Sequence, residues 1–215
     1  MEFINFQDIN LSSMHLSKTQ GTKSTVYIDN DKCYKILDKL YISEKRKLLE
    51  KFIDMDGIII NGILFPKELI IEDDRLVGYT MDYFKDSMNL YDFFTRGRFV
   101  DINDIFSAVK KASLIVRKAH ENGIILQDLS FDNILSNDNL DIKICDIDGC
   151  KYKRKMSPFI SMIMHNYYDV FMKKPYTVDE NFDNQSLLLS MLLSIYHNMA
   201  FSMDTYDKLS DKTKT

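Results

Sequence analysis

Near the middle of the chain, three side chains that carry oxygen atoms stand at the ends of short apolar segments. Asp128 and Asn133 stand five positions apart after the apolar run 124–126, and Asp146 follows the apolar stretch 142–145. In phosphoryl transfer, one carboxylate orients the attacking hydroxyl, while an amide and a second carboxylate hold magnesium on the nucleotide phosphates. The three side chains suit that chemistry. The alternative is a polar loop between two core strands, in which Asn and Asp serve as turn formers.

The same run resembles the catalytic loop and metal-binding strand of the protein-kinase-like superfamily. That family's pattern is His-Arg-Asp, four residues, Asn, and then Asp-Phe-Gly. Asp128 matches the catalytic aspartate, Asn133 the metal-binding asparagine and Asp146 the metal-binding aspartate. Two departures stand out, because Leu126-Gln127 replaces His-Arg and Ile147-Asp148 replaces Phe-Gly.

Residues 16–37 are predicted to form three strands, with a glycine turn after the first. In kinases the first two strands and their turn cover the phosphates, and a lysine on the third strand grips the α- and β-phosphates. Gly21 resembles the one glycine kept from that turn, and Lys35 resembles the lysine. The resemblance also places Val26, on the second strand, at the nucleotide. Lys35 lies between two apolar residues, so its charge needs a partner. A solvated lysine in an ordinary meander is the alternative.

Residues 41–54 show the pattern of an amphipathic helix, with Ser43 as a plausible N-cap. In a kinase this helix supplies a glutamate that pairs with the strand lysine and fixes it on the nucleotide. Glu50 is the expected partner of Lys35, because it lies late on the helix beside the apolar stripe. Glu44 is the fallback, and a solvated glutamate is the alternative for either residue.

Residues 64–71 and 76–81 are predicted to form an antiparallel pair of strands. The run that follows looks like the kinase hinge, whose exposed backbone pairs with adenine. The resemblance therefore places Met81, Asp82 and Phe84 at the nucleotide, with Met81 at the back of the pocket. Core filling is the alternative for Met81.

Residues 101–121 carry the clearest helical periodicity, with Asp101 as N-cap and a stop at Asn122-Gly123. This helix runs straight into the candidate catalytic loop, as it does in kinases. His120 is interpreted as a buried hydrogen-bonding group. Asp183, at the start of a further apolar helix, matches a kinase aspartate that bonds the catalytic-loop backbone. The basic patch 151–155 is interpreted as a charged, solvated loop.

The composition and net charge of the chain argue against several classes of protein. The net charge of −4 offers no basic footprint for nucleic acid. Three cysteines without a Cys-x-x-Cys pair and four scattered histidines argue against a disulfide framework and a zinc cluster. No apolar run reaches membrane-spanning length, and no signal peptide is recognised, so we expect a cytoplasmic protein without a membrane partner.

The expected fold is α+β and bilobal, like a protein kinase. Residues 1–84 would form an N-lobe with the hinge, built of an antiparallel sheet and one helix, with residues 1–13 as an irregular arm. Residues 85–215 would form a shortened, mostly helical C-lobe that ends in a polar tail at 204–215.

The expected function is ATP- and Mg²⁺-dependent transfer of the γ-phosphate to a hydroxyl, first of all a Ser or Thr of a protein. Gln127 replaces the arginine that receives an activation-loop phosphate, so switching by that route is not expected. Ser130 replaces a lysine common in serine/threonine kinases, which leaves a small-molecule kinase open. A pseudokinase that only binds is the rival from another class. The oligomeric state is left open.

Overall fold

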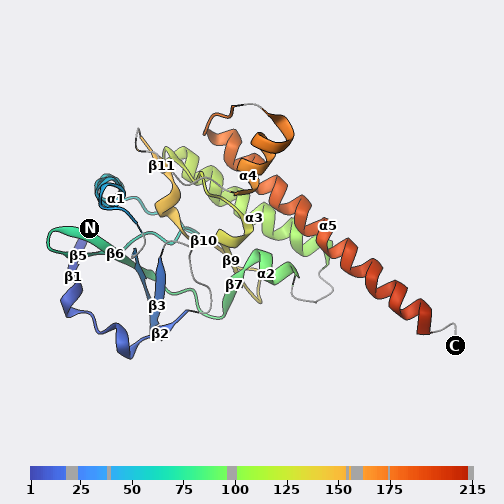
Figure 1. Ribbon diagram of the computed structural model, residues 1–215, viewed down its shortest axis with the longest axis horizontal. Coiled ribbons are helices and arrows are strands. Elements are labelled where there is room, and N and C mark those ends of the chain that lie inside the picture. The colour runs from blue at the N-terminus through green and yellow to red at the C-terminus, as the bar shows by residue number, and fades with distance from the viewer. Residues whose placement is uncertain are drawn as a thin grey trace.

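The computed structural model describes residues 1–17, 24–37, 40–95, 101–153, 155, 162–173 and 175–212. Gly21, which the resemblance places over the phosphates, lies outside these residues. The described chain is α+β, with a six-stranded mixed sheet in one part and long helices in the other (Figure 1). Within the described ranges, no helix combines the length and the apolar character that a membrane crossing needs.

The strands lie in both parts of the chain. They are β1 (Glu2–Asn5), β2 (His15–Leu16), β3 (Thr25–Asp29), β4 (Lys32–Ile36), β5 (Glu68–Glu72), β6 (Arg75–Asp82), β7 (Ser87–Asn89), β8 (Ile124–Ile125), β9 (Ile134–Asn137), β10 (Ile142–Ile144) and β11 (Lys151–Tyr152). The helices are α1 (Ile42–Asp54), α2 (Leu90–Thr95), α3 (Ile102–Glu121), α4 (Met162–Asn166) and α5 (Glu180–Lys212). A π-helical turn, Tyr167–Met172, follows α4.

The large sheet has the strand order β1-β5-β6-β4-β3-β2. Its centre is antiparallel, and the pairing of β4 with β6 sets Lys35 opposite Tyr79. At one edge, β1 pairs in parallel with β5, so that Glu2 lies opposite Glu68. The prediction of an irregular arm is therefore wrong for residues 2–5. Their aromatic and β-branched side chains suit a strand, and they cover an otherwise open edge of β5.

Helix α1 packs against β6 and contributes Leu48 and Phe52 to the buried interior. The Phe52 ring meets the Tyr79 ring edge-on, with 5.2 Å between centroids. The helix begins one residue after Tyr41, whose backbone N–H donates to the Glu44 carboxylate at 3.0 Å. Ser43 therefore lies in the first turn, and its prediction as N-cap is wrong.

Helix α3 forms as predicted. The Asp101 side chain accepts a hydrogen bond from the Asn103 backbone N–H at 2.9 Å, and Gly123 follows the helix with φ +72°. The neighbouring helix α5 turns serines inward, and the Ser186 hydroxyl donates to the Leu129 carbonyl. Helix α5 continues past the rest of the molecule to Lys212 (Figure 1), so most of the expected polar tail is helical.

Three apolar clusters lie in the described interior, and the smallest, around Phe182, packs at the start of α5. The two larger ones position the candidate site. One joins the sheet to α1 and includes Phe52 and Tyr79, and the other joins α3 to strands β8 to β10 and includes Val116. Leu135 on β9 packs against the first cluster, although β9 is paired with β10. The two parts of the chain therefore meet at the strands that precede the candidate site.

A short connection holds β10, and with it the segment that follows, against α3. The Ile144 backbone N–H donates to the Gly62 carbonyl at 2.7 Å, and the Leu64 N–H donates to the Ile144 carbonyl at 2.9 Å. Gly62 has φ +104°, and a Cβ there would lie 2.5 Å from Cδ1 of Ile115 on α3. Glycine therefore lets this connection pass close to the helix.

Substitution of Gly62 by alanine should lower the free energy of unfolding more than the same change at Gly57. Both residues have positive φ, but a Cβ at Gly57 would have no described atom within 4 Å. The shared backbone cost cancels, so the difference reports the clash with Ile115, about 1–3 kcal/mol for an overpacked core. Urea unfolding of both variants measures it, and equal losses would contradict the close approach at Gly62.

Candidate active site

The Lys35 ammonium contacts two carboxylates of residues 145–150, the segment that follows β10. Its Nζ is 2.9 Å from Oδ1 of Asp148 and also contacts Oδ1 of Asp146. The side chain of Lys35 is 7% exposed, and that of Asp146 is 35% exposed. Since a buried ammonium is stable only with a partner, these carboxylates hold the lysine in place. Lys35 and Asp146, which stand 111 positions apart, therefore converge as predicted.

Asp148 is the residue of this site that sequence reasoning missed. Besides Lys35, its carboxylate accepts a hydrogen bond from the Tyr79 hydroxyl at 3.1 Å. Burial acts to raise the pKa of Asp148, but the Lys35 charge and these two hydrogen bonds outweigh it, so the pKa lies below its usual value. The available signal was a carboxylate within an apolar segment, because such a charge requires a partner.

Burial also raises the pKa of the Tyr79 hydroxyl well above its usual value, and the Asp148 charge adds to the effect. The hydroxyl therefore stays protonated and donates to Asp148. Lys35 and Tyr79 both donate to Oδ1 of Asp148, so the carboxylate has two donors from the central strands of the sheet.

Helix α1 brings a lysine to this segment. Lys51 Nζ donates to the backbone carbonyls of Asp148 and Cys150, at 2.7 Å each. Lys51 is only 3% exposed, and burial lowers the pKa of its ammonium. The two carbonyl bonds compensate for part of that desolvation and fix α1 to the segment after Asp146.

The prediction that Glu50 pairs with Lys35 is wrong. The Glu50 carboxylate lies 3.4 Å from Nε of Arg46 and 3.9 Å from Nζ of Lys155. Leu48 faces the interior, and a residue two positions later points about 200° away around the helix. The predicted apolar stripe includes Leu48 and Phe52, which are buried, but the inward position next to Phe52 is occupied by Lys51, and Glu50 beside the stripe is exposed. The fallback, Glu44, is occupied at the start of the helix, where it accepts from Tyr41.

Asp128 lies directly beside this segment. A Cβ on Gly149 would be 2.9 Å from the Asp128 Cβ, so the chain after Asp146 passes close to the loop at a glycine. Asn133 Nδ2 donates to the Asp128 carbonyl at 2.7 Å, and the Cys145 N–H donates to the Asn133 carbonyl at 3.0 Å. The predicted trio of Asp128, Asn133 and Asp146 is therefore held together by short-range contacts.

The loop before Asp128 is fixed by a buried carboxylate on α5. Asp183 accepts hydrogen bonds from the backbone N–H groups of Leu126 and Gln127, at 2.7 and 2.8 Å. It also lies 2.9 Å from Nε2 of His120. Gln127 has φ +60°, a backbone conformation that costs free energy in a non-glycine residue. The predictions that Asp183 bonds the loop backbone and that His120 is a buried hydrogen-bonding group are confirmed.

Apolar side chains from both parts of the chain gather next to the charged groups. Val26, Met81 and Phe84 belong to the same cluster as Leu135 and Cys145. Leu135, on β9, was not among the predicted site residues, because its strand had been considered only as part of the catalytic loop.

The predicted residue Asp82 lies at the end of β6 and is exposed, and its carboxylate is 2.6 Å from Nζ of Lys67. Its neighbour Tyr83 donates its backbone N–H to the Asp31 carbonyl at 2.8 Å. The side chain of Asp82 therefore points to solvent, and any contact with a nucleotide would come from the backbone of this connection.

The donor atoms near Asp128 suit Mg²⁺. Asp146 offers a carboxylate and Asn133 an amide oxygen, and proteins bind Mg²⁺ through one or two such groups together with substrate phosphates and water. The described residues contain no group of three or more His, Cys, Asp and Glu side chains that could hold a metal.

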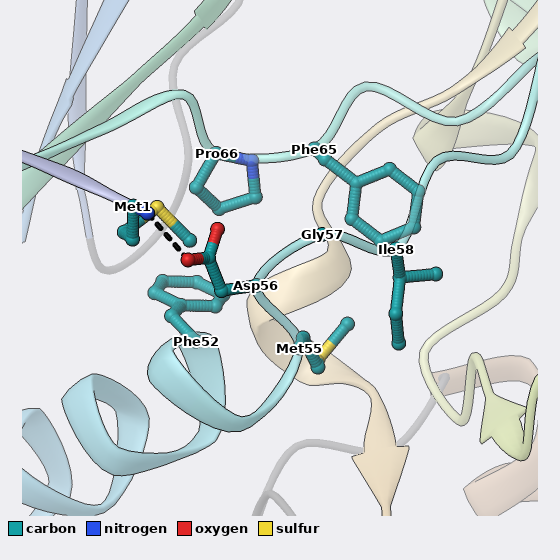
Figure 2. Close-up of a pocket in the computed structure, with 8 residues that line it drawn as sticks. All are labelled: Met1, Phe52, Met55, Asp56, Gly57, Ile58, Phe65 and Pro66. Carbon is teal, nitrogen blue, oxygen red and sulfur yellow. Dashed lines mark hydrogen bonds and ion pairs between the residues drawn. The ribbon is translucent and has the colours of Figure 1, made fainter.

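Two cavities lined by described residues lie near the N-terminal strand. The smaller, of about 40 Å³, lies between Phe52, Phe65 and Pro66, beside the ion pair of the Met1 amine with Asp56 (Figure 2). The larger, of about 340 Å³, is lined by charged side chains of β4 and the start of β5. Neither cavity is lined by the residues of the candidate site.

The basic patch 151–155 is partly engaged in internal contacts. Lys151 Nζ donates to the Val178 carbonyl at 2.8 Å, and Lys155 Nζ lies 2.8 Å from the Asp54 carboxylate. The interpretation as a solvated loop is therefore wrong for these two lysines. Lys155 adds a second link between α1 and the chain after Asp146.

Replacement of Lys51 by methionine should destabilise the fold. The carbonyls of Asp148 and Cys150 would lose their charged donor in a buried place, which costs about 1–3 kcal/mol. Lys47→Met, on the exposed side of the same helix, is the matched control and should change the free energy of unfolding by less than about 0.5 kcal/mol. Denaturant unfolding compares the two variants, and equal free energies of unfolding would contradict a stabilising role for the hydrogen bonds of Lys51.

No family model matches the chain, and no curated protein matches its sequence.

Proposed function

We propose that the protein is an ATP- and Mg²⁺-dependent phosphotransferase that moves the γ-phosphate to a hydroxyl of a protein Ser or Thr. The observation that carries this proposal is the convergence of Lys35 with Asp146, next to Asp128. Phosphoryl transfer needs a cation for the phosphates, ligands for magnesium and a carboxylate for the acceptor. These three requirements correspond to side chains that meet from distant parts of the chain.

Lys35 would bind the α- and β-phosphates of ATP, and Asp146 and Asn133 would hold Mg²⁺. The ion would neutralise charge on the phosphates. The side chain of Asp146 is about one-third exposed, so its carboxylate can reach a ligand while it stays near Lys35. Val26, Met81 and the other apolar residues of their cluster would contact the adenine.

Asp128 would orient the acceptor hydroxyl and accept its proton. Its loop is fixed by hydrogen bonds to the backbone. Asp183 accepts from two N–H groups of the loop, and Asn133 donates to the Asp128 carbonyl. A carboxylate that is held in position in this way avoids the entropic cost of finding the acceptor.

A purely structural role explains this arrangement less well. Buried ion pairs contribute little to stability compared with apolar residues of similar volume, because desolvation offsets their attraction. Here a lysine, two carboxylates and a tyrosine hydroxyl are gathered at one place, where a third carboxylate lies beside a glycine. Such clusters of charged groups are concentrated at functional sites.

A small-molecule acceptor is the second candidate. Ser130 stands where many serine/threonine kinases carry a lysine, and it is buried, with 8% exposure. Purified protein should be offered labelled ATP with protein mixtures and, separately, with metabolite pools. Label that enters only metabolites would decide for this candidate.

Asp128→Asn should lower the rate of phosphate transfer about 100-fold or more, because the variant keeps its shape but loses the proton acceptor. ATP affinity should stay at the wild-type value. Asp132→Asn, an exposed carboxylate on the turn that follows, is the matched control and should keep wild-type transfer. Transfer by Asp128→Asn at the wild-type rate would refute the role given to Asp128.

ATP should stabilise the protein against heat only when Mg²⁺ is present. At 100 times the dissociation constant, the gain is about 2.7 kcal/mol. Thermal unfolding with Mg²⁺ or with EDTA measures the effect, and adenosine is the control, since it lacks the phosphates that share the metal. If MgATP leaves the unfolding temperature unchanged, the result would instead favour a binding module that takes no nucleotide.

A further inference from the structure

In the kinase-like family that the sequence resembles, a helix glutamate orients the strand lysine. Helix α1 offers no such contact among the described residues, because Glu50 faces Arg46 and Lys155. At the inner side of the helix stands Lys51, whose ammonium binds main-chain carbonyls. The counter-ion of Lys35 therefore has to come from another element.

We infer that Asp148 is the positioning residue that holds Lys35 for the triphosphate, in place of a glutamate from the helix. The inference rests on the proposed function, since it concerns how the same site binds ATP. It assigns to Asp148 a role in nucleotide affinity that acts through Lys35 and needs no carboxylate from α1.

The two carboxylates on Lys35 differ in access to solvent. The side chain of Asp146 is 35% exposed, whereas that of Asp148 is 9% exposed. Asp146 can therefore turn to a metal when nucleotide binds, while Asp148 stays with the lysine. Without the second carboxylate, Lys35 would lose its fixed partner at the moment when it has to meet the phosphates.

Asp148 is itself held at both ends. Tyr79 donates to the carboxylate at 3.1 Å, and Lys51 donates to the backbone carbonyl at 2.7 Å. Tyr79 is 1% exposed and packs against the Phe52 ring. A carboxylate with these fixed contacts can set the direction of the Lys35 ammonium, because its own position cannot relax.

Asp148→Asn tests the inference by separating binding of the phosphates from binding of the adenosine. The variant should weaken MgATP binding about 10- to 100-fold and leave adenosine binding unchanged, because adenosine does not reach Lys35. Glu50→Gln is the matched control, because in the kinase family this helix supplies the carboxylate that pairs with the strand lysine. This variant should bind MgATP like the wild type. Calorimetric titration of the full chain gives both affinities.

A double-mutant cycle shows whether Asp148 acts through the lysine. Lys35→Met should also weaken MgATP binding, and adding Asp148→Asn to it should cause no further loss. If Asp148→Asn fails to fold, Tyr79→Phe removes one donor to the carboxylate and should still weaken MgATP binding several-fold, with adenosine binding unchanged.

The outcomes separate the two proposals. A wild-type protein that binds no MgATP overturns the proposed function, and the inference falls with it. Suppose that the wild type binds MgATP and that Lys35→Met weakens this binding. If Asp148→Asn and Tyr79→Phe then leave MgATP binding intact, the inference alone is overturned. Equal losses for adenosine and MgATP in the Asp148→Asn variant would mean a general structural defect and would also overturn it.

Discussion

One buried ammonium constrains the rest of the structure. Lys35 stands on a central strand of the sheet, where its charge requires counter-ions that the sheet does not supply. The segment after β10 supplies them through Asp146 and Asp148, and this contact joins the two halves of the sequence. The sheet, α1 and the helical part are therefore arranged so that one lysine meets two carboxylates.

The segment and the loop beside it are fixed in the same way, through their backbones. Asp183 accepts from two N–H groups of the loop before Asp128, and Lys51 donates to two carbonyls of the segment after Asp146. Each tether places a charged side chain against main-chain dipoles in a buried region, where such hydrogen bonds are strong. Loop and segment thus keep their relative position although neither belongs to an α-helix or to the large sheet.

Local patterns were sufficient for most elements and for the order of the site residues. The periodicity of α3, the strands around Lys35 and the spacing of Asp128, Asn133 and Asp146 could all be read from short windows of sequence. The role of Asp148 could not, because its partners lie on distant strands and only packing brings them together. The choice of Glu50 failed for a different reason. Successive helix residues are turned by about 100°, so its closeness to the apolar stripe in sequence did not bring Glu50 to the inner face.

Among the described residues, the hydrogen bonds of the Lys51 ammonium go to main-chain oxygens, and this affects how the sequence can change. Every amino acid presents the same carbonyl, so substitutions at Asp148 and Cys150 keep the acceptors of Lys51. A change at either position cannot compensate for the loss of Lys51. Over evolutionary time, position 51 should therefore covary weakly with position 148, through the attraction between the two charges, and not with position 150. Lys35, Tyr79 and Asp148 meet through their side chains, so these three positions should covary.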